Sequence, residues 1–275
     1  MNTLRRFLST PEGMAGGLIL LVLLMIALLA PFLFPQNPLA ISGAPLLPPF
    51  EDWAHPLGTD RLGRDVFVGI VYGARSSLTV ALASAAMSIL VGSVVGTVSG
   101  FAGGIVDETI MRIADAFQTV PGFLLALTFV SVVGPSLGVI VAAIALSAWT
   151  GPARIARAEV LSIRERDYVA SARVIGMRPA EIAFREILPN ALPPVLALSA
   201  VIVAAAILTE AALSFLGLGD PNRVSWGGMI AEGRQYVNQA WWLMALPIVC
   251  VIVAVLGMNA LGDGLREALD PVERR

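Results

Sequence analysis

The stretch Tyr168–Asn190, YVASARVIGMRPAEIAFREILPN, interrupts a chain that otherwise consists mostly of long apolar segments. Its residue order predicts a helix, a turn and a second helix outside a bilayer. Gly176 suits the left-handed position that ends a first helix. Pro179 suits the first turn of a second helix, where its missing N–H costs nothing. Pro189 marks the point at which the next membrane-spanning helix is expected to begin.

The first helix of this hairpin is expected over 165–175, with Val169, Ala172 and Ile175 on one side. In the second helix, Glu181 is expected to help satisfy the open N–H groups of the first turn. The hairpin therefore has one apolar side that needs a surface to pack against.

Two surfaces are possible for the hairpin, the lipid headgroups or a cytoplasmic partner protein. A helix on lipid buries bulky apolar groups, whereas a helix in a protein groove gains from close backbone approach. The small side chains of Ala170, Ser171 and Ala172 favour docking on a protein.

The apolar segments around the hairpin indicate a membrane protein. Of the 275 residues 57% are hydrophobic and 14% charged, and the mean hydropathy is +0.81, whereas about a quarter of the residues of a soluble domain are charged. A hydrocarbon core of ~30 Å needs about 20 apolar helical residues. Six spans are predicted: Met14–Phe34, Ser76–Phe101, two helices within 116–153 separated at Gly134–Ser136, 187–209 and 235–262. A cleaved secretory signal, the alternative for the first span, is disfavoured because its apolar core is too long.

Arginine placement predicts the orientation of these spans. With six spans both termini lie on one side, and that side carries thirteen of the eighteen arginines together with the hairpin. Basic residues accumulate on the cytoplasmic side of membrane proteins. We therefore expect both termini and the hairpin in the cytoplasm, and residues 57–64 on the outer side.

The hairpin resembles the EAA signature of permease subunits of bacterial ABC importers. Ala170, Ser171 and Ala172 stand at the triplet, Gly176 follows after three residues, and Leu188-Pro189 follows after eleven more. The glutamate of the triplet is absent, as is usual in the peptide and nickel branch. The pattern YV-AAR--G of that branch is similar to Tyr168, Val169, Arg173 and Gly176. Arg178 stands where that branch often has a serine cap.

Three further regions resemble the same branch. They are LGTDRLGRDVF (Leu57–Phe67) with YGARSSL (Tyr72–Leu78), VDETIMRIADAF (Val106–Phe117), and TEAALSFLGLG (Thr209–Gly219) with SWGGMI (Ser225–Ile230). The likeness thus runs from about residue 57 to the C-terminus. It is a likeness to the second permease of dipeptide, oligopeptide, nickel or glutathione importers.

This resemblance implies an all-α polytopic protein of the bacterial inner membrane, with the type I ABC importer permease fold and a coupling helix between spans 4 and 5. We expect residues 1–75 to form an N-terminal cytoplasmic segment, the first span and a periplasmic loop. Residues 76–275 would form a core permease domain with five spans and the coupling insert 151–189. The residues expected to couple to an ATPase are Tyr168, Val169, Ala170, Ser171, Ala172, Arg173, Gly176, Glu181, Leu188 and Pro189.

The chain itself is not expected to be an enzyme or to hold a cofactor or metal. It contains no lysine, so it cannot carry the phosphate-binding loop G-x-x-x-x-G-K-[ST]. The resemblance implies two ATP-binding subunits, a second homologous permease, a solute-binding protein and a lipid environment, and no nucleic acid. The alternatives are a stand-alone secondary transporter or channel, which usually shows internal repeats, and a membrane enzyme, which would need clustered polar residues at membrane depth.

Glu210 directly follows the uncharged run 187–209, near the outer end of the fifth helix, and is the one acidic residue expected inside a spanning helix. Charged groups in hydrocarbon cost a few kcal/mol or more and normally face a cavity or a partner. Glu210 is either a pore or gate residue, together with Ser214, or a structural carboxylate that bonds to the neighbouring loop. The second interpretation is slightly favoured.

The expected outer loop combines glycines with charged residues, a pattern that makes turns and invites local ion pairs. Its motif residues are Gly58, Thr59, Asp60, Gly63, Arg64 and Asp65. His55 beside them has no second ligand at metal spacing, so a loop role is expected. Trp53, Trp226, Trp241 and Trp242 are expected in an aromatic belt at the outer boundary.

The predicted topology can be tested by cysteine labelling. In a variant with Asp60→Cys and the single native cysteine replaced by serine, a membrane-impermeant maleimide should react from the outer face of intact cells. Reaction only after the inner face is exposed would reverse the assigned orientation.

Overall fold

A computed structural model describes residues 10–269, and the regular elements in that range are helical. The longer helices are α2 (Pro11–Leu33), α3 (Val66–Ala102), α4 (Gly104–Thr119), α5 (Gly122–Val133), α6 (Leu137–Ala148), α7 (Thr150–Ile163), α8 (Asp167–Val174), α10 (Leu188–Ala197), α11 (Ser199–Leu213), α12 (Trp226–Gly233) and α13 (Trp242–Leu269). The short ones are α9 (Pro179–Glu181), the π-helices η1 (Ile182–Ile187) and η2 (Ser214–Leu218), and the 3₁₀ helix η3 (Arg234–Tyr236). The predicted cytoplasmic residues 1–9 and the arginines 274 and 275 lie outside the described range.

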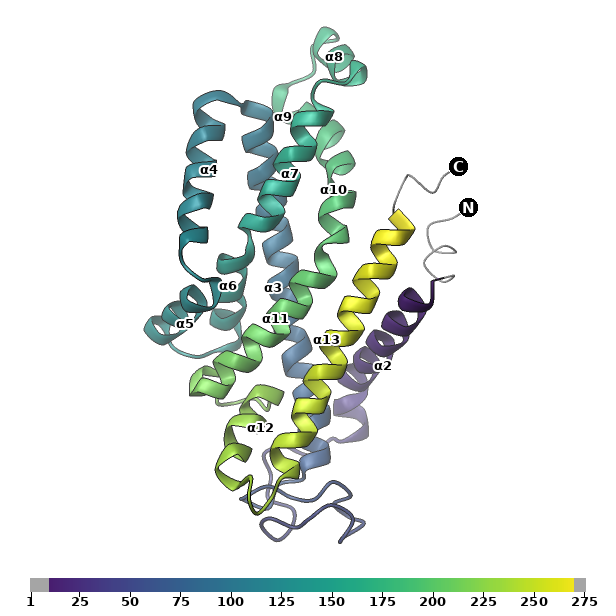
Figure 1. Ribbon diagram of the computed structural model, residues 1–275, viewed down its shortest axis with the longest axis vertical. Coiled ribbons are helices and arrows are strands. Elements are labelled where there is room, and N and C mark those ends of the chain that lie inside the picture. The colour runs from purple at the N-terminus through teal and green to yellow at the C-terminus, as the bar shows by residue number, and fades with distance from the viewer. Residues whose placement is uncertain (1–9, 270–275) are drawn as a thin grey trace.

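The helices form one elongated bundle with two distinct ends (Figure 1). The hairpin with α8 lies at one end, here called the α8 end, and the loop 35–65 lies at the other, here called the loop end. The first turn of α2 and the last turn of α13 both point toward the α8 end. This placement agrees with the expectation that the chain enters and leaves the membrane on the side of the hairpin.

The structure contains up to six membrane spans. Four helices are long and apolar enough to cross by themselves, namely α2, α3, α11 with η2, and α13. Two further candidates are bent pairs, α4 with α5 at 84° and α6 with α7 at 46°. Counting each pair as one span gives the predicted six.

The third and fourth spans are built differently from the prediction. The break at Gly134 is confirmed, since its φ is 100° and Ser136 caps the following helix. However, α5 and α6 have only 12 residues each, too few for a hydrocarbon core that needs about 20. The amphipathic helices α4 and α7 lengthen them in two different ways. Val120 and Pro121 are extended and end α4 before α5 begins, whereas the backbone stays helical through Trp149 from α6 into α7.

Helix α3 is the central element of the bundle, and its small residues bring it against α7. Gly92, Gly96 and Gly100 recur every fourth residue on the face toward α7. A Cβ atom at Gly96 would overlap the carbonyl oxygen of Ala153, and one at Gly100 would lie 3.0 Å from Cβ of Val160. Small residues at helix interfaces let backbones approach closely where lipid supplies no hydrophobic driving force. The glycines therefore determine how close α3 and α7 lie.

Helix α2 lies at the side of the bundle against α13 (Figure 1). Only 17% of its most apolar window is buried within the chain. The contact again uses glycine, because a Cβ at Gly16 would overlap the backbone N of Leu261, and one at Gly257 would lie 2.5 Å from Ile19. The exposed apolar face of α2 is the one expected to meet lipid.

Two of the four tryptophans expected in an aromatic belt are buried instead. Trp226 and Trp242 are 1% and 4% exposed, and their indole N–H groups donate to backbone carbonyl oxygens of α3 and of the loop. The prediction was wrong for these two because Trp226 packs against α3 near Gly73 and Trp242 packs against the loop at Gly58. Trp53 and Trp241 are exposed, at 86% and 59%.

The α3–α7 contact yields a test of stability. Gly96→Ala should lower the free energy of unfolding by about 1–3 kcal/mol, the usual cost of overpacking, because the new methyl group meets backbone. Gly138→Ala in α6 is the matched control, since a Cβ there has nothing within 4 Å. The control should be neutral or stabilising. Equal losses in SDS unfolding of the two variants would contradict the packing argument.

Candidate functional site

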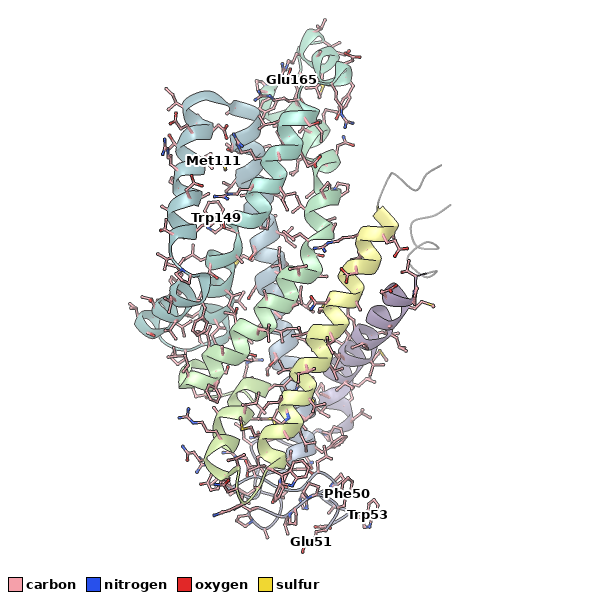
Figure 2. All side chains as sticks on the ribbon, viewed as in Figure 1. Phe50, Glu51, Trp53, Met111, Trp149 and Glu165 are labelled. Atoms are coloured by element: carbon pink, nitrogen blue, oxygen red, sulfur yellow. The ribbon has the colours of Figure 1, made fainter. Side chains whose placement is uncertain are left out.

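Helix α8 lies at the tip of the α8 end, beyond the span that contains α7 (Figure 1). Figure 2 places Glu165 at this tip and Phe50, Glu51 and Trp53 at the opposite tip of the molecule. The helix is shorter than expected, since α7 continues to Ile163 and α8 occupies only Asp167–Val174. The predicted coupling residues thus form a compact element far from the loop end.

The end of α8 has the geometry that the glycine predicts. Gly176 has a φ of 82°. Its N–H donates to the carbonyl of Arg173, and the N–H of Met177 donates to that of Ala172, both at 3.1 Å. These two bonds define a Schellman motif, which satisfies the last carbonyl groups of the helix. A residue other than glycine at position 176 would strain this backbone.

The buried face of α8 joins the hairpin to the neighbouring helices. Val169 and Ala172 are 0% and 6% exposed, as expected for the apolar side. They pack in one cluster with side chains of α7, η1 and α10, namely Val160, Ile163, Ile182, Ile187 and Ala191. Ile175 was also predicted on this side, but it is 77% exposed. The prediction was wrong because the helix ends at Val174 and Ile175 is already the C-cap residue.

The opposite face of α8 is uncovered. Val174 and Ile175 are 87% and 77% exposed, and a Cβ at Gly176 would meet nothing within 4 Å. The other exposed residues of this face are Tyr168, Ala170, Ser171 and Arg173. These seven residues are called the docking face below. Val174 was not identified from the sequence as a docking residue. The signal that was available is its position directly before the C-cap residue and Gly176.

The second arm of the hairpin is continuous with the next span, which corrects two expectations. Pro189 lies in the first turn of α10, but helical backbone already begins at Pro179 and runs through η1. Glu181 does not cap this arm. Its carboxylate pairs with Arg185 at 2.6 Å, and Arg178 at the N-cap makes no side-chain capping bond either. The π-helical turn, a common feature at functional sites, therefore connects the hairpin to α10 without a break.

Charged side chains hold the base of the hairpin. Arg157 of α7 binds Asp107 of α4 in bidentate geometry, with N–O distances of 2.5 and 2.6 Å. Ser99 of α3 donates to the same carboxylate. Arg164 donates to the carbonyl of Gly100 at 2.8 Å. Bidentate arginine–carboxylate pairs add geometric specificity, so α3, α4 and α7 are fixed to one another next to α8.

Glu210 lies toward the loop end, within α11, and is 3% exposed. Ser77 of α3 donates to Oε2 at 2.9 Å, and Ser214 donates to Oε1 at 2.7 Å. The backbone N–H of Trp226, the first residue of α12, donates to Ser77 at 3.4 Å. The carboxylate therefore connects three helices, which favours the structural of its two predicted roles. A contact of Glu210 or Ser214 with substrate stays a prediction.

The six motif residues of the loop shape the entry into α3. Gly58 and Gly63 adopt φ values of 78° and 80°. Asp65 caps α3 by accepting from two backbone N–H groups, and Asp60 accepts from two others. The expected ion pair between Asp60 and Arg64 is loose, at 3.9 Å. The remaining residue, Thr59, donates to the carbonyl of Ala44 at 2.5 Å.

His55 holds the same loop together. Its side chain is buried, with Nδ1 3.1 Å from Asp52 and Nε2 3.0 Å from Ser42. The backbone N–H of Ala54, and next the His55 ring, lower the pKa of Asp52 below its ordinary value. His55 thus has the loop role that was expected.

Known proteins match the chain along its length. Residues 88–275 match the family described as binding-protein-dependent transport system inner membrane component, and residues 2–50 match the N-terminal TM domain of oligopeptide transport permease C. The chain is 36% identical over 279 residues to the oligopeptide transport system permease protein OppC of Bacillus subtilis, covering 100% of this chain and 90% of the relative. It is 38% identical over 268 residues to the di/tripeptide transport system permease protein DppC of Pseudomonas aeruginosa, covering 94% and 88%.

The fold has a counterpart among solved structures. A chain of the MetNI methionine ABC transporter in an inward-facing conformation superposes with a TM-score of 0.59 at 20% identity, over 74% of this chain and 98% of that one. This likeness confirms the expected permease fold. The matching family and relatives are importer permeases, so a stand-alone transporter or channel is not favoured. An ABC importer permease is a non-catalytic subunit that works with ATP-binding subunits and a binding protein. The chain therefore belongs to the family of binding-protein-dependent transport system inner membrane components, as a multi-pass permease subunit of an ABC importer.

Proposed function

We propose that this chain forms half of a peptide translocation pathway, paired with a second, similar permease and driven by two ATP-binding subunits on its cytoplasmic face. The peptide class rests on the OppC and DppC relatives, whose names state oligopeptide and di/tripeptide transport. The orientation, with both termini and α8 in the cytoplasm, rests on the arginine asymmetry. In the proposed division, residues 1–75 supply the first span and outer loop, and residues 76–275 supply the core with the insert 151–189.

The docking face is the observation that carries this proposal. Its two large aliphatic side chains, Val174 and Ile175, are 87% and 77% exposed beside an unobstructed glycine. Contiguous exposed apolar groups mark interaction sites. A membrane surface is the poorer match, because α8, at whose C-terminal end these residues stand, lies at the extreme tip of the elongated bundle (Figure 1) rather than along the side of its spans. A groove on an ATP-binding subunit would cover them.

Movement of such a subunit would reach the membrane through two rigid connections. Val169 and Ala172 pack on α7, and the second arm continues into α10 and α11. A displacement of α8 would therefore re-aim both the fourth and the fifth span. Allosteric transitions of this kind need packed elements that move as units. At the far end, the Glu210 carboxylate would pass the motion of α11 to α3 and α12.

Gly176→Val tests the coupling role of the hairpin. The valine would strain a left-handed backbone position by roughly 1 kcal/mol or more and add bulk to the docking face. Recovery of the ATP-binding subunits with the purified permease should fall at least tenfold, and uptake should fall with it. Gly104→Val is the matched control, because Gly104 also has positive φ (54°) and open space around its Cβ, and it belongs to α4 rather than α8. Normal recovery of the ATP-binding subunits with the Gly176→Val variant would contradict the assignment of α8 as the docking helix.

Val174→Glu tests the docking face without backbone strain. Burial of a valine side chain is worth about 1.5–3 kcal/mol, and a charge in its place would have to be desolvated. ATPase recovery should therefore fall at least tenfold while thermal stability of the permease is unchanged. Ile105→Glu in α4 is the control, since Ile105 is 84% exposed and lies outside α8. An equal effect of both substitutions would mean that apolar exposure in general, not docking on α8, explains the loss.

A further inference from the structure

A cavity of about 380 Å³ lies at the loop end of the protein. Its walls come from the turn before α3, the first turn of α3, the connection between η2 and α12, and α12 itself. These segments are far apart in sequence and converge at the lower end of the bundle in Figure 1. Cavities of roughly 300–1,000 Å³ are the usual size of small-molecule sites. The opposite end of the molecule carries the docking face, so this cavity belongs to a different surface.

The lining of the cavity carries charges of both signs. It contains the arginines and carboxylates Arg61, Arg64, Arg223, Asp60, Asp65, Asp220 and Glu232. The three aspartates already have backbone partners. Asp60 and Asp65 accept from loop and helix N–H groups, and Asp220 accepts from the N–H of Leu137 at 3.1 Å. These bonds fix the positions of the three carboxylates in the walls, although those to Asp60 and Asp65 use only Oδ1.

Several charged groups of the lining make no side-chain hydrogen bond within residues 10–269. Arg61 and Glu232 are exposed and form no ion pair within residues 10–269. The Nε–H of Arg64 is buried and has no hydrogen-bond acceptor in the same range, since its nearest carboxylate oxygen, on Asp60, is 3.9 Å away. A buried donor without an acceptor is energetically unfavourable. The Arg64 side chain as a whole is 25% exposed and lines the cavity, so a ligand oxygen can contact Arg64 through its exposed atoms rather than through Nε.

Between these groups the cavity has small and apolar walls. Room for the backbone of a ligand is left by the small residues Ser214, Gly217 and Gly228. Apolar surface is supplied by Met229 and Tyr236. Gly217 keeps this shape with a φ of 85°. Ser214 is held by its bond to Glu210, so the floor of the cavity is fixed to the hydroxyl–carboxylate network that connects α3, α11 and α12.

We propose that this cavity binds a short zwitterionic peptide on the outer side of the membrane, with the peptide carboxylate at Arg61 and Arg64 and the ammonium group at Glu232. This inference rests on the proposed peptide transport. It adds the location of a peptide-binding site and the orientation of the peptide within it. A zwitterion matches a lining that offers free guanidinium and free carboxylate groups together. Charge-assisted hydrogen bonds give the recognition, and the small residues accommodate the peptide backbone.

The site can be tested by protection of a cysteine in the complete importer, reconstituted without its binding protein. In a Cys250→Ser background, Ala231→Cys places a thiol in the lining, and Glu51→Cys places one at the tip of the loop. A charged methanethiosulfonate should modify both from the outer side. Millimolar trialanine should slow modification of the Ala231→Cys thiol at least fivefold and leave the Glu51→Cys thiol unaffected. N-acetyl-trialanine amide, which lacks both charges, should protect neither.

Charge-removing variants test the proposed placement of the peptide carboxylate and ammonium groups. Glu232→Gln and Arg61→Gln should each raise the half-protecting concentration of trialanine three- to tenfold. Equal protection by the capped peptide, or none by trialanine, would overturn the proposal. So would a thiol in Ala231→Cys that never reacts while that in Glu51→Cys does, because a protein chain would then fill the cavity.

Uptake of radiolabelled trialanine by the complete importer, measured in parallel with its binding protein present, separates the two hypotheses. Uptake without protection would overturn the binding site and leave the proposed peptide transport intact. Protection without uptake would support the site and count against the transport proposal.

Discussion

The backbone contact between α3 and α7 is the interaction on which the rest of the arrangement depends. Hydrocarbon offers no hydrophobic drive between helices, so association rests on close van der Waals packing. Gly96 lets the α3 backbone approach the carbonyl of Ala153, and Gly100 accommodates Val160. The contact runs from the membrane region toward the α8 end. It therefore holds α7, and with it the hairpin, in a defined direction outside the bilayer.

From this base the hairpin is a rigid extension of two spans rather than a flexible loop. The cluster around Val169 joins α8 to α7 on one side and to η1 and α10 on the other. The Schellman motif at Gly176 closes the tip. Because the second arm passes through a π-helical turn without a break, force applied to the docking face acts on α10 and α11 directly. Packed elements of this kind transmit discrete displacements rather than bending.

Polar interactions secure the two ends of the bundle. At the α8 end Arg157 and Asp107 form a half-buried bidentate pair, and at the loop end hydroxyl groups of Ser77 and Ser214 surround the Glu210 carboxylate. Buried charges are costly unless all their hydrogen-bonding capacity is used. At both sites each carboxylate oxygen accepts at least one hydrogen bond, and the donors come from more than one helix. These polar contacts therefore specify which helices are neighbours at each end. In the apolar middle of the bundle, small residues specify the neighbours instead.

The sequence by itself determined the features that depend on neighbouring residues. The lengths of the apolar segments predicted the spans, and Gly176 and Pro179 predicted the turn of the hairpin. The spacing from Ala170 to Pro189 pointed to the permease family, because caps, turns and hydrophobic runs are local. Tertiary structure decided what depends on residues distant in the chain. Pairing of Glu210 with Ser77 joins positions 133 residues apart, and burial of Trp226 and formation of the cavity walls both require distant segments to lie together in space. No local sequence pattern predicts these long-range contacts, since they result from the packing of whole helices.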